Sequence, residues 1–319
     1  MSAFGHVVSA ELFKVLRKRR TYVVAGLWWG LLPILTLTAG QLLQTNLGGS
    51  FVDEGGSVSM VVQAVASPFG LARIALVGPA YLSPTFYIIV AALFAALLIG
   101  EERSQSMWKT VLVAQPNRMA VLAGKVAVAM IVVAALLLGA LLASVLVGAI
   151  GMTFLPTTWA GEWVALFRLY AVQWTFMLAA VTFSFLMVFL TRNVALGMVL
   201  VFFLPALLEG LYSLYALAVG FQPVNRLNVF FQTLQLRQTL EDLPRYFFTN
   251  NLYFPARSPV TDLIAIFGDI DGGGGSPMGA IPGLLGGGVT LSHAALVMVG
   301  YIVVFGTILA WRFAQHDVD

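Results

Sequence analysis

The sequence VAVAMIVVAALLLGALLASVLVGAIG, residues 126–151, runs for 26 residues without a charged side chain. A helix needs about 20 mostly apolar residues to cross the hydrocarbon core of a bilayer. Transmembrane strands would instead show alternating polar and apolar residues in shorter segments. Because this stretch is continuously apolar, it predicts a transmembrane helix.

Five further runs along the chain have a similar length and character. Together the runs predict an all-α integral membrane protein with six transmembrane helices in a single transmembrane domain, residues 1–319. A shorter apolar stretch at 61–77 contains Ser67, Pro68 and Arg73 and predicts an interfacial or partly inserted helix. The six predicted spans are 21–43, 80–100, 126–151, 169–190, 194–220 and 291–312.

The composition supports a membrane location. Of the 319 residues, 60% are hydrophobic and 10% are charged, and the mean hydropathy is +0.92. Soluble domains have about 45–50% apolar and about 25% charged residues. The sequence shows no long block of like charge, so no nucleic-acid partner is expected. The absence of cysteine excludes disulfides and thiolate chemistry.

The distribution of charge predicts the orientation. With the N-terminus inside, the cytoplasmic segments contain eleven basic and five acidic residues, a net charge of +6, and the opposite side contains six basic and nine acidic residues, a net charge of −3. The positive-inside rule therefore predicts a multi-pass protein with both termini cytoplasmic. The inside basic residues are Lys14, Arg17, Lys18, Arg19, Arg20, Arg103, Lys109, Arg118, Lys125, Arg192 and Arg312.

Residues 1–20 predict an amphipathic interfacial helix. Apolar residues recur along one side at helical spacing, whereas Phe13 lies off that side, and a basic group follows. Such a helix lies on the inner membrane surface with its cations at the lipid head groups. Alternatively, the basic group only sets the orientation of the chain. The apolar residues are Phe4, Val8, Leu12, Val15 and Leu16, and the basic residues are Lys14, Arg17, Lys18, Arg19 and Arg20.

The loop between the second and third predicted spans also predicts a short amphipathic helix. Glu101 and Glu102 open it, and acidic residues favour the positive end of a helix dipole. Met107 and Trp108 lie on or beside its apolar face. Pro116 ends it, because the residue before a proline avoids the helical region. An apolar face in the cytoplasm requires either the membrane or a partner protein.

The sequence contains no recognisable catalytic chemistry. It lacks the Walker pattern, and His6, His293 and His316 are scattered, so no catalytic, cofactor-binding or metal-binding residue is predicted and the chain is not expected to be an enzyme. A protease pair of Ser184 and His293 is disfavoured because the two lie at different depths. Few ionisable residues fall within the spans, which argues against an ion-coupled carrier.

The layout resembles the permease subunit of transporters of the ABC type-2 exporter family. The local match is ERSQSMWKTVL at 102–112, followed by Pro116-Asn117-Arg118 and Gly124-Lys125, and the ELFK start at 11–14 resembles the family's N-terminal helix. Ser106 and Met107 stand where this family often has Gly-Thr.

The resemblance implies that residues 101–119 form a coupling helix seated in a separate ABC ATPase, which would bind ATP and magnesium. It also implies a second permease copy or homologue, and an outer part that folds back as short helices to cap the path, which would suit residues 206–246. The predicted topology places residues 221–290 in an extracytoplasmic segment. The chain would then export a hydrophobic or amphipathic substrate across a bacterial plasma or inner membrane. The alternative is a non-transporting scaffold or anchor subunit. The expected ATPase-coupling residues are Glu101, Glu102, Met107, Trp108, Lys109 and Arg118.

Overall fold

Most of the chain is described by a computed structural model. The described residues are 3–47, 57–82, 85–100, 102, 117–191, 193–220, 242–256 and 289–315. Within these ranges the protein is helical and has no strand.

Among the described residues, five helical stretches are long and apolar enough to cross a membrane. The first, Arg19–Thr45, combines α2 (Arg19–Gly26), the π-helical turn η1 (Leu27–Leu31) and most of α3 (Leu32–Leu47). These stretches confirm five of the six predicted spans. The other four are α9 (Arg118–Gly151), α10 (Trp163–Thr191), the Val194–Tyr212 part of α11 (Val194–Gly220), and α16 (Leu291–Gln315).

The predicted span at 80–100 is shorter in its described part. It contains α6 (Thr85–Ala95) and a second π-helical turn, η2 (Ala96–Gly100), of which Ile89–Gly100 is an apolar helix shorter than a full span. The sixth span therefore stays a prediction. The bent helix pair that precedes this stretch is the other candidate for a crossing.

That pair consists of α4 (Ser57–Ala66) and α5 (Pro68–Leu82), which meet at 59°. The α5 helix packs inside the bundle. Its contact with the first span includes a hydrogen bond from Nε1 of Trp28 to the carbonyl of Ala75, at 2.9 Å. A Cβ on Gly148 would lie 2.5 Å from the Cα of Pro68, so only glycine allows α9 to approach so closely. The predicted helix at 61–77 is thus two helices, of which the second is buried against α9.

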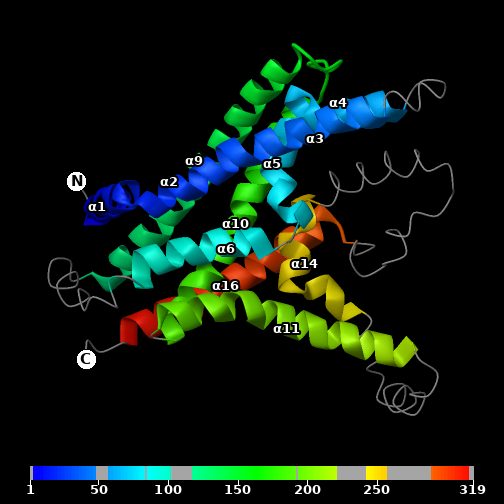
Figure 1. Ribbon diagram of the computed structural model, residues 1–319. Coiled ribbons are helices and arrows are strands. Elements are labelled where there is room, and N and C mark those ends of the chain that lie inside the picture. The colour runs from blue at the N-terminus through cyan, green and yellow to red at the C-terminus, as the bar shows by residue number, and fades with distance from the viewer. Residues whose placement is uncertain are drawn as a thin grey trace.

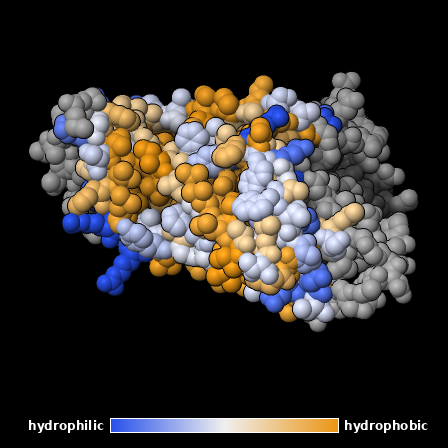
Figure 2. Space-filling view, turned by 90° about the horizontal axis from the view of Figure 1, so that it is seen from above, coloured by the Kyte–Doolittle hydropathy of each residue, from blue (hydrophilic) through white to orange (hydrophobic). Residues whose placement is uncertain are grey.

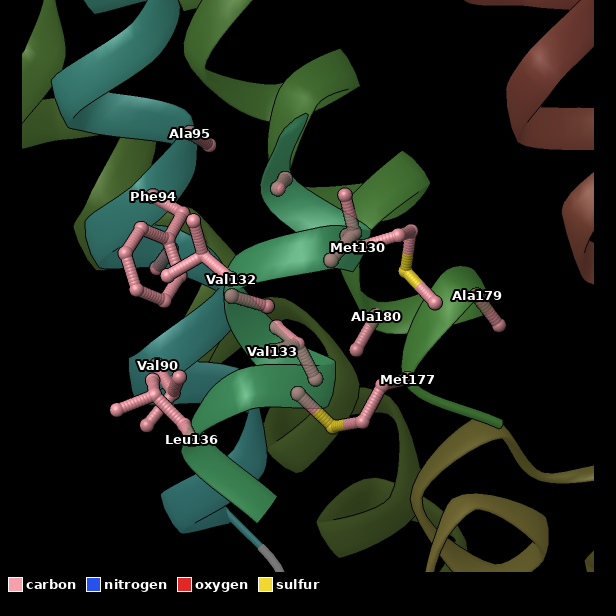
Figure 3. Packing of buried hydrophobic residues seen from close by; sticks show 14 of the residues in the cluster. Val90, Phe94, Ala95, Met130, Val132, Val133, Leu136, Met177, Ala179 and Ala180 are labelled. Atoms are coloured by element: carbon pink, nitrogen blue, oxygen red, sulfur yellow. The ribbon is translucent and has the colours of Figure 1, made fainter. Parts of the chain in front are cut away.

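The centre of the bundle is formed by α6, α9 and α10. Their side chains face one another in Figure 3, and Phe94, Val133 and Met177 are buried. Trp174 donates from Nε1 to the carbonyl of Met130 at 3.0 Å, and the Tyr170 hydroxyl donates to the carbonyl of Ala134 at 3.1 Å. Between membrane helices, close packing and hydrogen bonds of this kind replace the hydrophobic effect.

The outside of the bundle is apolar. Figure 2 shows broad hydrophobic areas on the visible face. Large side chains on α11 and α16 are exposed, among them Phe203 at 64% and Leu296 at 74%. Apolar patches of this extent are rare on soluble monomers. The exposed surface therefore supports the membrane location.

The short helix α14 (Phe248–Leu252) and the 3₁₀ turn η4 (Leu243–Tyr246) lie against α10, α11 and α16. The Phe248 ring lies 5.3 Å from Phe183 and 6.0 Å from Phe305, centroid to centroid. Phe183 is 20 residues beyond the start of α10, or about 30 Å along the helix. Phe248 therefore reaches well inside the bundle. Of the predicted extracytoplasmic segment at 221–290, residues 242–256 and 289–290 are among the described residues.

The N-terminal helix α1 (Ala3–Arg17) and the C-terminal end of α16 lie at the same end of the bundle (Figure 1). Arg118, at the start of α9, joins this end by donating from Nη1 to the carbonyl of Ala314 at 3.1 Å. This arrangement agrees with the predicted placement of both termini on one side. Which side of the membrane that is stays a prediction.

Candidate functional site

The inner face of α1 packs directly on α9. A Cβ on Gly124 would lie 2.5 Å from Cγ1 of Val7, so the two helices are in close contact there. Val15 is buried on this face, and so is the carboxylate residue Glu11, which is 3% exposed. The residues of the predicted apolar side of α1 therefore differ in their surroundings. Val8 and Leu12 pack inward, whereas Phe4 and Leu16 are exposed.

Glu11 is buried because it pairs with a lysine that is also buried. Lys125 on α9 is 0% exposed, and its Nζ donates to Glu11 Oε1 at 2.8 Å and to the Leu98 carbonyl at 2.7 Å. The same Nζ lies 2.8 Å from Glu102 Oε2. An ammonium group has three N–H donors. Two of these donors bond Glu11 and the Leu98 carbonyl, and Glu102 Oε2 lies within ion-pair distance of the same ammonium group.

Lys14 completes the arrangement. Its Nζ donates to Glu102 Oε1 at 2.6 Å and to Glu11 Oε1 at 3.1 Å. Each carboxylate is thus shared by two lysines, and the four charges alternate around a ring with no net charge. We call Glu11, Lys14, Glu102 and Lys125 the charge cluster. Burial of charge is tolerated when the groups are paired and hydrogen-bonded in this way.

The end of η2 is held by cations from two neighbouring elements. Lys18, between α1 and α2, donates from Nζ to the Leu97 carbonyl at 3.1 Å, and Lys125 takes the next carbonyl, Leu98. Cations near the C-terminal end of a helix are favoured by its dipole. On another side, a Cβ on Gly100 would lie 2.6 Å from Cγ2 of Val194 at the start of α11. The end of η2 is therefore fixed by three surrounding elements.

The charge cluster favours the ionised forms of Glu102 and Lys14. Burial alone would raise the pKa of Glu102, but the ammonium groups of Lys125 and Lys14 outweigh it and hold this pKa below its ordinary value of 4.5. Burial alone would lower the pKa of Lys14, but the carboxylates of Glu102 and Glu11 outweigh it and hold this pKa above 10.5. The pairing between α1 and Glu102 is therefore retained throughout the physiological pH range.

The charge cluster lies at the base of the 101–119 segment. Glu102 is near one end of that segment, and Lys125 is seven residues beyond Arg118 at its other end, about 10 Å along α9. The 34-residue helix α9 spans about 51 Å, which exceeds the roughly 30 Å of a hydrocarbon core. Lys125 can therefore lie at the membrane surface although it is buried in protein.

The predicted coupling residues fall into two groups. Glu102 is 7% exposed and belongs to the charge cluster, and Arg118 begins α9. Glu101, Met107, Trp108 and Lys109 lie outside the described residues. Of the predicted interfacial cations, Lys14 and Lys18 make the bonds given above, the Arg17 guanidinium lies 4.2 Å from the centre of the Phe13 ring, and Arg19 and Arg20 are exposed.

Sequence reasoning missed the roles of Glu11 and Lys125. Both stand out in retrospect, since Glu11 interrupts the apolar side of a helix and Lys125 directly precedes a 26-residue apolar run. A charge in such a place requires a partner. The sequence does not reveal that partner, because 114 residues separate the two.

The described residues contain no cluster that suggests catalysis or metal binding. No group of three or more His, Asp or Glu residues within them could hold a metal ion. Ser184 is buried on α10, whereas His293 lies 3.1 Å from the Arg245 carbonyl and contacts the Tyr246 ring. The predicted lack of pairing between Ser184 and His293 agrees with these contacts.

The fold and its exposed apolar surface define a multi-pass helical membrane protein, with a buried charge cluster at one end of the bundle. A family model described as "ABC-2 family transporter protein" matches residues 7–207, more than half of the chain. The chain belongs to the ABC-2 transporter family and is an ABC transporter membrane subunit. The match begins within α1 and includes all four residues of the charge cluster. No curated protein matches the chain.

Proposed function

We propose that this chain is the permease subunit of an ATP-driven exporter and is coupled to a separate ABC ATPase through residues 101–119. The observation that supports this most directly is the family match. The full sequence has no Walker pattern, so ATP and its magnesium ion would bind to the partner subunit. Coupling also requires that a cytoplasmic segment be firmly attached to the spans, and the charge cluster lies at the base of the 101–119 segment.

Met107 and Trp108 are the residues proposed to contact the ATPase. A large apolar side chain gains about 1.5–3 kcal/mol when it leaves water. Tryptophan is also among the residues most often found as interface hot spots. Glu102, by contrast, is buried against Lys14 and Lys125. We therefore propose that Glu102 supports the coupling segment from within and does not form its contact surface.

The exposed side of α1 is proposed to lie on the inner leaflet of a bacterial plasma membrane. Phe13 and Leu16 are 56% and 49% exposed, and Arg17 stands over Phe13. Exposed apolar groups together with cations suit an anionic lipid surface. This placement puts both termini in the cytoplasm, as the charge distribution predicts.

A second permease copy or homologue is proposed to complete the transport path. Gly26 and Gly30 in the first span are four residues apart, and no described atom lies within 4 Å of a Cβ built on either. Small residues at this spacing allow close helix approach. Native mass spectrometry of the active complex should show two permeases, and a single copy would contradict the pairing. The apolar spans suit a hydrophobic or amphipathic substrate, and the outer segment between spans five and six is proposed to cap the path.

The coupling is tested by a pull-down of the ATPase with the tagged permease. Wild type should retain an ATPase, and Trp108→Glu should lose most of it while still inserting in the membrane. A matched control is Trp159→Glu, because Trp159 is 49% exposed in the loop after the far end of α9. If Trp108→Glu retains the ATPase as well as the control does, the proposed contact is wrong. If wild type retains no ATPase, the scaffold function replaces transport.

A further inference from the structure

We propose that the charge cluster is a rigid joint, which makes the two ends of the 101–119 segment and α1 move as one body. Glu102 is the central positioning residue of this joint. The inference rests on the proposed function, because it assumes that an ATPase displaces the segment. It adds α1 to the parts of the permease that receive this displacement.

The two stems of the 101–119 segment are joined to each other at its base. Glu102 follows η2 at one end of the segment, and Lys125 belongs to α9 at the other end. The 2.8 Å ion pair between them joins the two stems directly. Lys125 also donates to the Leu98 carbonyl within η2, so the same two stems are joined a second time. A displacement of the segment therefore cannot simply spread its stems and must be passed to both helices.

Helix α1 is attached to both stems. Lys14 bonds Glu102 at the η2 stem, and Glu11 bonds Lys125 at the α9 stem. Next to Lys125, Gly124 is in close contact with Val7 of α1. Lys18 adds a bond from the end of α1 to the Leu97 carbonyl. Charge pairing and close packing thus hold α1 to the same two helices.

Breaking the ring of charges would cost free energy. Glu11 and Lys125 are almost fully buried, so a charge that lost its partners could not recover them from water. Each lysine bonds groups from two chain segments far apart in sequence. Movement of α9 alone would leave Lys125 without a carboxylate, and movement of the Glu102 end alone would leave Glu102 without a lysine. Movement of α1 alone would break the Lys14–Glu102 and Glu11–Lys125 pairs together. Movement of the elements together leaves every pair intact, and it is therefore the favoured motion.

A purely structural role is the alternative to a rigid joint. In that case, loss of one bond would lower the stability of the permease but would not change how α1 moves during the ATPase cycle. The two roles differ in the distance between α1 and α9 before and after the ATPase closes. The absence of cysteine in the chain makes that distance measurable with spin labels at introduced cysteines.

The experiment uses the full permease–ATPase complex in lipid nanodiscs, with spin labels at Ala10→Cys on α1 and Ala123→Cys on α9, both of which are exposed positions. Distances are recorded without nucleotide and after trapping with ATP and vanadate. We expect one unchanged distance in the wild-type background and a shifted or broadened distance on trapping in Glu11→Gln, which removes the charge pair between α1 and Lys125. In the Glu102→Gln complex, the stimulation of ATP hydrolysis by the permease should fall by about tenfold. This is the effect expected when one charge-assisted hydrogen bond is lost.

Glu162→Gln serves as the matched control, since Glu162 is an exposed carboxylate near the far ends of α9 and α10. If Glu102→Gln does not fold, Lys14→Met replaces it, because the Lys14 side chain is 43% exposed and its removal opens only one side of the ring. Equal distances and equal hydrolysis in wild type, the control and the cluster variants would overturn the joint. An absence of ATPase from the wild-type complex would instead refute the proposed function itself.

Discussion

Replacement of Lys125 by methionine should destabilise the protein more than any other single change in the charge cluster. Methionine has a comparable length but donates no hydrogen bond. The substitution would leave the buried carboxylates of Glu11 and Glu102 with only Lys14 between them. Removing one partner from a buried ion pair costs about 3–5 kcal/mol. With about 2–4 °C per kcal/mol, the midpoint of thermal unfolding should fall by about 6–20 °C.

Thermal unfolding of purified permease in lipid nanodiscs measures this effect. Lys18→Met is the matched control, because Lys18 lies at a half-buried position outside the charge cluster and donates to the Leu97 carbonyl. Loss of that hydrogen bond should cost about 0.5–1.5 kcal/mol. Adding Glu11→Gln and Glu102→Gln to Lys125→Met should restore part of the stability, since no unpaired carboxylate then remains. If Lys125→Met unfolds at the wild-type temperature, Lys125 is not paired as described and the argument fails.

Three further predictions concern the pH dependence of stability, the contact between α1 and α9, and the orientation in the membrane. The contributions of Glu102 and Lys14 to stability should not change between about pH 5 and 10. Because the pKa of Glu102 is lowered, its contribution is lost only as pH falls below 4.5, and because the pKa of Lys14 is raised, its contribution is lost only as pH rises above 10.5. A pH series of unfolding midpoints checks both limits. Gly124→Leu should release α1 from α9 by collision with Val7, which protease cleavage within α1 would report, whereas Gly306→Leu, at an open position, should not release it. Single cysteines should react with a membrane-impermeant maleimide from outside at residue 260 but not at residue 110, and the reverse pattern would refute the six-span orientation.

The spans could be predicted from the sequence because length and continuous apolar character are local properties. Residues 126–151 and 291–312 needed no knowledge of their neighbours to be assigned to helices. The bend between α4 and α5 was harder to predict. Pro68 indicates a break, but the direction of α5 depends on its contact with Gly148, 80 residues away in sequence.

The charge cluster could not be predicted for the same reason. The basic residues at 14–20 suggested an interaction with lipid, and Arg17 and Arg19 are exposed as that reading requires. Lys14 instead bonds Glu102, because α1 turns Glu11 and not Leu16 toward α9. Helical spacing gives the faces of α1 but does not say which face a distant lysine will meet. Glu102, an expected ATPase-coupling residue, is likewise buried and pairs with Lys14 and Lys125.

The central claim, that this permease binds a separate ATPase through the 101–119 segment, is tested most directly by photo-crosslinking in intact cells. A photoreactive amino acid replaces Trp108 in one variant and Trp159, near the opposite end of the bundle, in the other. The account predicts that the residue at 108 captures a protein containing a Walker motif, identified by mass spectrometry, and that the residue at 159 does not. Capture of lipid alone at 108, with no ATPase, would contradict it.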